Sequence, residues 1–191
     1  VDPGTGGYYA SPKAREHLAS WQAHNGPHFI DDPFPRRRGT FLWRDLHEPP
    51  QPFDDGITVG AQLDTPGGRL RRRVKLKEEG GTQRWNIHDD VEGDRRDWEV
   101  RWQFAPGWVC SVDQDQILAV RDGSEVRMAV KSEARWTLEG PWEGATSGPD
   151  IDDCRSGLCS PSYRRFEGGF VLIIRPAGAE LTTQVWSDEE I

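Results

Sequence analysis

The sequence predicts an all-β fold, a large antiparallel β-sandwich of two packed sheets with about a dozen strands and at most one short helix. The 21 glycines and 14 prolines recur between short apolar runs, as turns do when they join many strands. Many of those runs alternate apolar and polar residues, which is the period of a half-buried strand. Nine tryptophans and seven phenylalanines supply apolar area for one core, so we expect a single domain over residues 1–191.

The first predicted element is a short helix that begins at Ser11 and Pro12. Serine accepts amide hydrogen bonds at the start of a helix, and proline suits its first turn. Ala14, Leu18 and Trp21 then recur at helical spacing. We therefore expect this helix to bury one apolar side.

Strands are expected along most of the remaining sequence. Extended structure is predicted at residues 28–31 and 40–46, followed by a proline-rich surface crossing between sheet layers at 47–55. The alternation then predicts strands at residues 57–63, 69–77, 83–89, 98–104, 134–140, 168–176 and 180–186. The strongest is 98–104, in which Trp98, Val100, Trp102 and Phe104 share one face.

A tight hairpin is predicted within residues 116–130. Asp122 and Gly123 lie between two apolar runs there, and a two-residue hairpin turn needs positive φ angles that these residue types tolerate. A long polar loop is expected further along, from Gly144 to Ser160.

The charge distribution excludes some classes of partner. A formal net charge of −8 argues against a nucleic-acid-binding protein, because the mean field repels polyanions. The basic run "RLRRRVKLK" at 69–77 alternates cations with Leu70, Val74 and Leu76, which predicts a strand with one solvent-exposed face. No apolar run reaches the length of a membrane span, so we expect neither nucleic acid nor membrane as a partner.

The three cysteines form no convincing metal-binding pattern. Cys154 and Cys159 are five residues apart and could form a disulfide in an oxidising compartment. Free thiols are the alternative, and Cys110 stands alone.

Five segments of the sequence occur in the order seen in the β-sandwich region of heparinase II/III-like polysaccharide lyases, which the chain resembles over nearly its whole length. They are "VDPGTGGYY", "SWQAHNGPHFID", "LRRRVKLKEEGGTQRWNIHDDVEGD", "WEVRWQFAPG" and "CSPSYRRFEGG". The most specific motifs are "DPGT" with its following tyrosine, and "AHN". In that family an N-terminal (α/α) toroid precedes the sandwich.

The resemblance implies a lyase that cleaves uronate-containing polysaccharide by β-elimination. Most catalytic groups of the family, including a tyrosine, lie on the toroid. We therefore expect no catalytic residue in this chain, no activity for the chain alone, and the toroid of the same polypeptide as its partner. Because the sequence opens without methionine, we expect a C-terminal fragment of a longer chain, periplasmic or secreted as in the family. The alternative is a non-catalytic carbohydrate-binding or docking module.

The resemblance also implies a divalent-metal site, with zinc the metal that an aspartate and imidazoles suit. Asp2 of "DPGT" and His24 of "AHN" would be two ligands, with a third histidine expected just upstream of Val1. Simpler roles remain open, namely a turn aspartate bonded to the "GTGG" backbone for Asp2 and a structural histidine for His24. For His28 we expect a place on the surface.

Five further residues are candidates for binding an acidic polysaccharide. They are Asn25, Arg36, Arg37, Arg38 and Trp43. The asparagine could face sugar hydroxyls or bond the backbone at a bend. The arginines could pair with uronate or sulfate by bidentate contacts, or form a solvated loop. The tryptophan could stack on a sugar ring or pack in the core.

Overall fold

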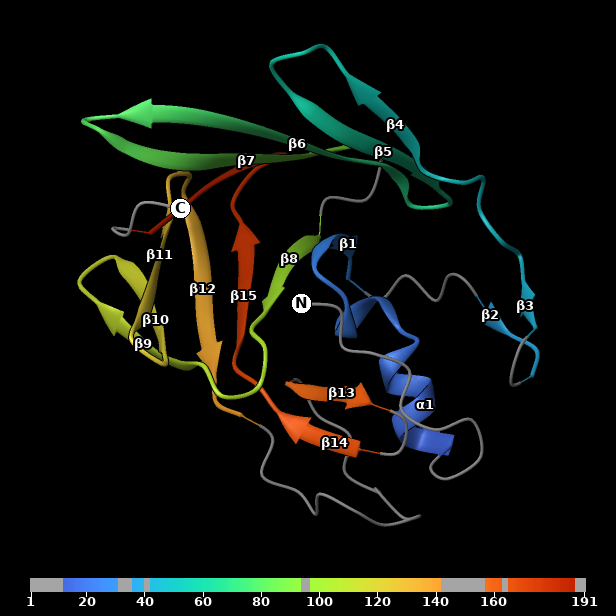
Figure 1. The fold of residues 1–191 in the computed structure, drawn as a ribbon. Helices are drawn as coiled ribbons and strands as arrows, with labels where there is room; N and C mark the ends of the chain where they lie inside the picture. The colour runs from blue at the N-terminus through green and yellow to red at the C-terminus, as the bar shows by residue number, and fades with distance from the viewer. Residues whose placement is uncertain are drawn as a thin grey trace. The chain divides into compact units, whose positions relative to one another are not determined.

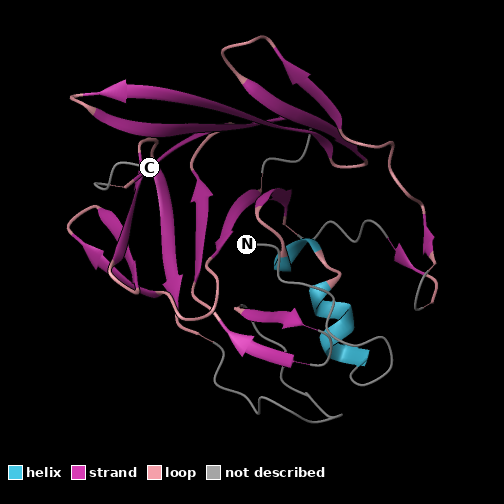
Figure 2. Cartoon of the chain, in the orientation of Figure 1, coloured by secondary structure: helices cyan, strands magenta, loops and turns pink. Residues whose placement is uncertain are grey.

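The computed structural model describes residues 12–30, 36–39, 42–93, 97–141, 157–162 and 165–187. These residues form an all-β fold of the sandwich class, built on two large antiparallel sheets of 8 and 4 strands. Figure 1 labels the strands, and Figure 2 shows how strongly they outweigh helix. The predicted fold class is confirmed, and the strands of the two large sheets together match the dozen expected.

The strands of each sheet are named in the order in which neighbouring strands pair. The larger sheet has the order β4 (Gln51–Asp54), β5 (Val59–Thr65), β6 (Gly68–Glu79), β7 (Thr82–Glu92), β16 (Glu180–Trp186), β11 (Ser124–Val130), β10 (Gln116–Arg121) and β9 (Val109–Asp113). The smaller sheet has the order β1 (Gly26–Phe29), β8 (Trp98–Gln103), β15 (Val171–Pro176) and β12 (Ala134–Glu139). Two hairpins complete the described strands, β2 (Arg36–Arg37) with β3 (Trp43–Arg44) and β13 (Leu158–Ser162) with β14 (Arg165–Gly168).

The predicted short helix is present as α1 (Pro12–Leu18), which buries Ala14 and Leu18. Trp21 does not continue it, because the chain turns after Leu18 and Trp21 begins the 3-10 helix η1 (Trp21–Ala23). Neither helix of the described segments is long and apolar enough to cross a membrane.

Internal contacts divide the chain into two compact units, each assembled from three segments. Unit 1 comprises Val1–Gly26, Val100–Cys110 and Trp136–Ile174, and unit 2 comprises Pro27–Glu99, Ser111–Arg135 and Arg175–Ile191. The single-domain organisation expected from the length stays a prediction.

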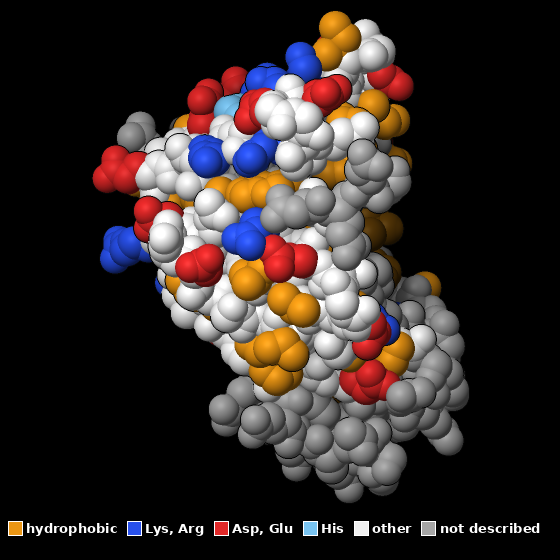
Figure 3. Space-filling model, turned by 60° about the vertical axis from the view of Figure 1, so that its left-hand side comes forward, with side chains coloured by type: hydrophobic (Ala, Val, Ile, Leu, Met, Phe, Trp, Pro, Cys, Tyr) orange, Lys and Arg blue, Asp and Glu red, His pale blue; other side chains and the backbone are white. Residues whose placement is uncertain are grey.

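Unit 2 contains the long strand β6, which has one apolar and one charged face as predicted for the basic run. Leu70 lies on the apolar face and is 5% exposed. On the other face, Arg69 pairs with Asp64 at 2.7 Å and Arg73 with Asp90 at 2.9 Å. Figure 3 likewise shows Lys and Arg side chains next to Asp and Glu on the face it presents. Cross-strand acids thus offset much of the positive charge of this run.

The hairpin prediction at Asp122 and Gly123 is confirmed. Arg121 pairs with Ser124, so the loop has two residues. Both loop residues have positive φ angles, 52° and 87°, as a type I′ turn requires.

Two loop predictions are wrong in part. Within the expected surface crossing, Gln51–Asp54 forms β4, which pairs with β5 at the edge of the larger sheet. An edge strand tolerates Pro52 because one side of it needs no backbone donor. The expected polar loop ends early, since β13 begins at Leu158.

In unit 1, Gly169 lies between β14 and β15, and its backbone passes unusually close to the backbones of Phe104 and Gly157. Its N–H donates to the Gly157 carbonyl oxygen at 2.7 Å. A Cβ at this position would lie 2.3 Å from the Phe104 carbonyl oxygen and 3.5 Å from Cys159 Sγ. Only glycine fits this approach without a shift of the backbone.

Replacing Gly169 by alanine is expected to lower the free energy of unfolding by about 1–3 kcal/mol, the usual cost of overpacking. Gly178→Ala is the matched control, because a Cβ there has no atom within 4 Å and alanine restricts the unfolded chain. Urea unfolding measures both. A Gly169→Ala variant as stable as the Gly178→Ala variant would contradict the close approach.

Candidate functional site

His24 follows η1, and its ring is held by the end of α1. Nε2 donates a hydrogen bond to the Leu18 carbonyl oxygen at 3.0 Å, and the backbone N–H of His24 donates to Trp21 at 3.1 Å. The Leu18 carbonyl fixes the orientation of the ring, as the second hydrogen-bond partner of a metal-ligating histidine does.

Asn25 anchors the bend after His24 to strand β8. Its side-chain oxygen accepts a hydrogen bond from the backbone N–H of Gln103 at 2.6 Å. This is the backbone-bonding role that the sequence left open for Asn25. The sugar-binding role stays a prediction.

Arg101 supports the same turn from β8. Its Nη1 donates to the Gln22 carbonyl oxygen at 3.2 Å, and the residue is 9% exposed. His17 of α1 lies within the electrostatic reach of Arg101 and His24. Burial is the main cause that lowers the pKa of His17, and the charges of Arg101 and His24 lower it further. The arrangement therefore favours a neutral imidazole at His17.

Sequence reasoning missed His17 of α1 and Arg101 of β8, and for Arg101 the reason lies in the burial of its strand. The alternation predicted one buried aromatic face, yet Glu99, Arg101 and Gln103 on the opposite face are also buried. Gln103 illustrates how such a polar face is accommodated, since its Nε2 donates to the Leu158 carbonyl oxygen at 3.0 Å. A period of two identifies a strand, but it does not say whether its polar face meets water.

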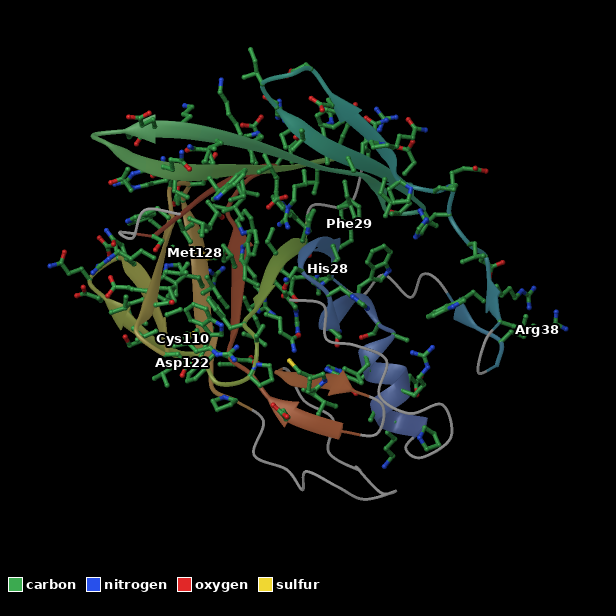
Figure 4. The ribbon with its side chains drawn as sticks, viewed as in Figure 1. His28, Phe29, Arg38, Cys110, Asp122 and Met128 are labelled. Atoms are coloured by element: carbon green, nitrogen blue, oxygen red, sulfur yellow. The ribbon has the colours of Figure 1, made fainter. Side chains whose placement is uncertain are left out.

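The expected surface position of His28 is wrong. This residue of β1 is 5% exposed, and its Nε2 lies 3.0 Å from Oε1 of Glu99. Oε2 of Glu99 accepts a hydrogen bond from Arg175 at 3.0 Å. The carboxylate replaces water as the partner of the imidazole, which explains how a histidine can be buried at this place. His28 is labelled in Figure 4.

Four of the five predicted polysaccharide-binding residues lie on one hairpin of unit 2, formed by β2 and β3. Arg37 pairs with Trp43 across this hairpin. Arg38 is exposed, and Figure 4 shows it pointing outward. Trp43 is half-buried. The fifth predicted residue, Asn25, and the predicted ligand His24 belong to unit 1.

The hairpin adds a cation that the sequence analysis missed. Arg44 pairs with Arg36 across the two strands, and its side chain is 71% exposed. Asp45 lies 3.7 Å from it and is also exposed. Arg44 could have been found only once the pairing of the two short strands was known.

Some predicted features lie outside the described residues. Asp2 and Cys154 are among them, so the proposed zinc pair stays a prediction. Within the described ranges, no group of three or more His, Cys, Asp or Glu side chains could hold a metal ion. Cys159 carries a free, buried thiol. Burial raises the pKa of this thiol, against the opposing effect of a hydrogen bond from Gln103.

A family model described as Heparinase II/III-like, C-terminal matches residues 1–187. The chain belongs to this family. The heparinase II/III-like C-terminal domain is a part of polysaccharide lyases, which confirms the resemblance found in the sequence motifs. A search of curated proteins found no match to this heparinase II/III-like chain.

Proposed function

We propose that this heparinase II/III-like chain is the C-terminal sandwich of a lyase that cleaves uronate-containing polysaccharide by β-elimination, and that it is inactive alone. The observation that carries the proposal is the β2–β3 hairpin, whose two paired strands hold three arginines and Trp43, with Arg38 directly after β2. Guanidinium groups bind carboxylate and sulfate with bidentate geometry. An aromatic ring beside them offers an apolar surface to a sugar.

The chemistry of the reaction explains why such a hairpin is useful. In β-elimination a base removes the proton at C5 of the uronate while the glycosidic oxygen leaves from C4. That proton is weakly acidic, so positive groups must stabilise the charge that develops on the C6 carboxylate, and a matched base must take the proton. We assign polymer binding to this chain. The base belongs to the N-terminal toroid of the same polypeptide.

We further propose zinc at the His24 turn, held by His24 and Asp2. Support comes from the hydrogen bond between Nε2 and the Leu18 carbonyl oxygen, which fixes the orientation of the imidazole at this turn. Bound zinc would supply a fixed positive charge at this turn. Asn25 and Arg101 keep the turn in place through Gln103 and Gln22.

Removal of the His24 imidazole is expected to weaken zinc binding by at least about tenfold, the effect typical of losing one element of a metal site. The variant is His24→Gln, whose amide can still donate to Leu18, and His47→Gln is the control. Isothermal titration with zinc chloride gives the affinities. Equal affinity of His24→Gln and wild type would reject the ligand assignment.

Binding of a uronate polysaccharide by the isolated chain tests the main proposal. We expect alginate or heparin to bind with an affinity that falls as salt rises, because salt screens the contacts of exposed arginines. Neutral dextran is the control. Equal binding of dextran would favour the alternative function, a general carbohydrate-binding module, and absence of any binding would contradict both.

A further inference from the structure

The chain has two Asp–Gly dipeptides, and each lies in the loop of a hairpin. Asp55–Gly56 belongs to the loop between β4 and β5, and Asp122–Gly123 is the whole loop between β10 and β11. All four residues are exposed. Among aspartyl dipeptides, aspartate before glycine rearranges most readily to isoaspartate, because glycine has no side chain to hinder its nitrogen. The sequence alone does not rank the two dipeptides.

The rearrangement changes covalent bonds but not the mass of the chain. The backbone nitrogen of the glycine attacks Cγ of the aspartate, an N–Cγ bond forms, and the carboxyl hydroxyl leaves with the amide proton as water. The product is a five-membered succinimide ring. Water then opens the ring. Opening at the side-chain carbonyl restores aspartate, and opening at the main-chain carbonyl gives isoaspartate.

Hydrogen bonds hold both reacting groups of Asp55–Gly56. The Gly56 N–H donates to Oδ1 of Asp54 at 2.8 Å. Oδ1 of Asp55 accepts from the backbone N–H groups of Thr58 and Ile57 at 2.7 and 2.9 Å. The bonds from Thr58 and Ile57 lower the pKa of Asp55, which disfavours the neutral carboxyl that loses water. The ring can therefore close only after these contacts open.

The reacting groups of Asp122–Gly123 are not held in this way. Among the described residues, no acceptor contacts the Gly123 N–H. A Cβ on Gly123 would have no atom within 4 Å. The Asp122 carboxylate accepts from Nε of the neighbouring Arg121 at 3.2 Å, and their side chains are 86% and 45% exposed. Such a surface pair is weak in water, so it leaves the carboxyl accessible.

The turn geometry places ring closure one peptide rotation away. Asp122 and Gly123 form a type I′ turn with φ angles of 52° and 87°. A succinimide ring fixes ψ of its residue at a value that fits the first loop position of a type II′ turn, the other type that two-residue hairpin loops adopt. Rotation of the peptide unit between the two residues interconverts these types, and only the glycine changes the sign of φ. Arg121 can stay paired with Ser124 throughout.

We propose that Asp122 is a site of spontaneous isoaspartate formation in the folded chain, and that the hydrogen bonds around Asp55 protect the second Asp–Gly dipeptide. Isoaspartate routes the main chain through the former side chain, which adds a methylene group to a loop of only two residues. The type I′ turn is then lost. Modification at Asp122 therefore weakens the β10–β11 hairpin.

The test is to age the folded chain at physiological temperature, with the chain unfolded in urea as the reference for each dipeptide. Digestion with an endoprotease that cuts before aspartate but not before isoaspartate, followed by fragmentation mass spectrometry, measures the product at each site. At Asp122 the folded chain should react at a rate similar to that of the unfolded chain. At Asp55 it should react at least about tenfold more slowly, because hydrogen bonds must break first.

Two variants separate the geometry from the sequence. Asp122→Asn retains a residue pair that suits the turn and should react faster than wild type, since ammonia leaves in place of water. Asp54→Ala frees the Gly56 N–H and should speed the reaction at Asp55 several-fold, with the rate at Asp122 unchanged.

Isoaspartate absent from Asp122 in the folded wild-type chain, or equal slowing of both dipeptides relative to urea, would overturn the proposal. An unchanged rate at Asp55 in Asp54→Ala would overturn the protection assigned to the hydrogen bond between Gly56 and Asp54.

Discussion

Replacing Arg72 by methionine is expected to lower the free energy of unfolding by about 3–5 kcal/mol, the cost of leaving a buried charge without its partner. Arg72 lies on β6, where it pairs with Asp89 of β7. Its Nε and Nη2 donate to the two carboxylate oxygens at 2.7 and 2.9 Å. The Asp89 side chain is fully buried, so in the variant water could replace the guanidinium only after local opening.

The loss of unfolding free energy in the Arg72→Met variant should depend on pH. Burial raises the pKa of Asp89 above 3.8, and the hydrogen bond and charge of Arg72 oppose the rise. Without Arg72 the folded-state pKa of Asp89 rises further. A raised carboxyl pKa favours folding at pH values below the unfolded pKa, and this contribution is lost as pH rises through the folded pKa. The deficit of the variant is therefore largest near neutral pH and shrinks as the pH falls toward 3.8.

Urea unfolding at several pH values measures this deficit. Arg73→Met is the matched control, because Arg73 pairs with the partly exposed Asp90, and such pairs contribute less than about 1 kcal/mol. The double variant Arg72→Met/Asp89→Leu should recover most of the stability, since apolar residues can replace a buried pair. If Arg72→Met and Arg73→Met lower the free energy of unfolding by the same amount, the buried pair of Arg72 and Asp89 contributes no more to stability than the partly exposed pair of Arg73 and Asp90.

Replacing Glu99 by leucine is the second large effect, expected to lower the free energy of unfolding by about 3 kcal/mol. Leucine keeps a similar volume but removes the acceptor of both His28 and Arg175. The His28 and Glu99 side chains are 7% and 3% exposed, so the imidazole would remain buried without that acceptor. The Arg175 side chain is 62% exposed and can be solvated.

Arg175→Gln separates the two contacts. It should cost less than about 1 kcal/mol, because an exposed guanidinium contributes little to stability. Thermal and urea unfolding of the two variants give the comparison. A Glu99→Leu protein no less stable than Arg175→Gln would show that the contact between His28 and Glu99 contributes little.

Much of the fold could be predicted from local patterns. The hairpin turn at Asp122 and Gly123 and the alternating strand β6 depend on backbone preferences and a period of two, both of which are local in sequence. The alternation also places Arg72 on the apolar face of β6. Its partner Asp89 is 17 residues away, and the pairing follows from a strand register that sequence alone does not specify.

The candidate site was less predictable for the same reason. Arg36, Arg37 and Arg38 were found because they are consecutive, whereas Arg44 joins them only through strand pairing. Arg101 was missed because its strand is buried on both faces, so a polar residue of the alternation became a buried contact with the turn before His24. The family resemblance pointed to His24 itself, and the hydrogen bond to Leu18 supplies the orientation of its ring.

The most direct test of the proposed lyase function is the absorbance of the C4–C5 double bond in unsaturated uronate, followed while heparin or alginate is incubated with protein. The proposed function predicts no product from the isolated chain, although it binds the polymer, and product when the chain is joined to the proposed N-terminal toroid. Product released by the isolated chain, or none from the joined protein, would contradict it.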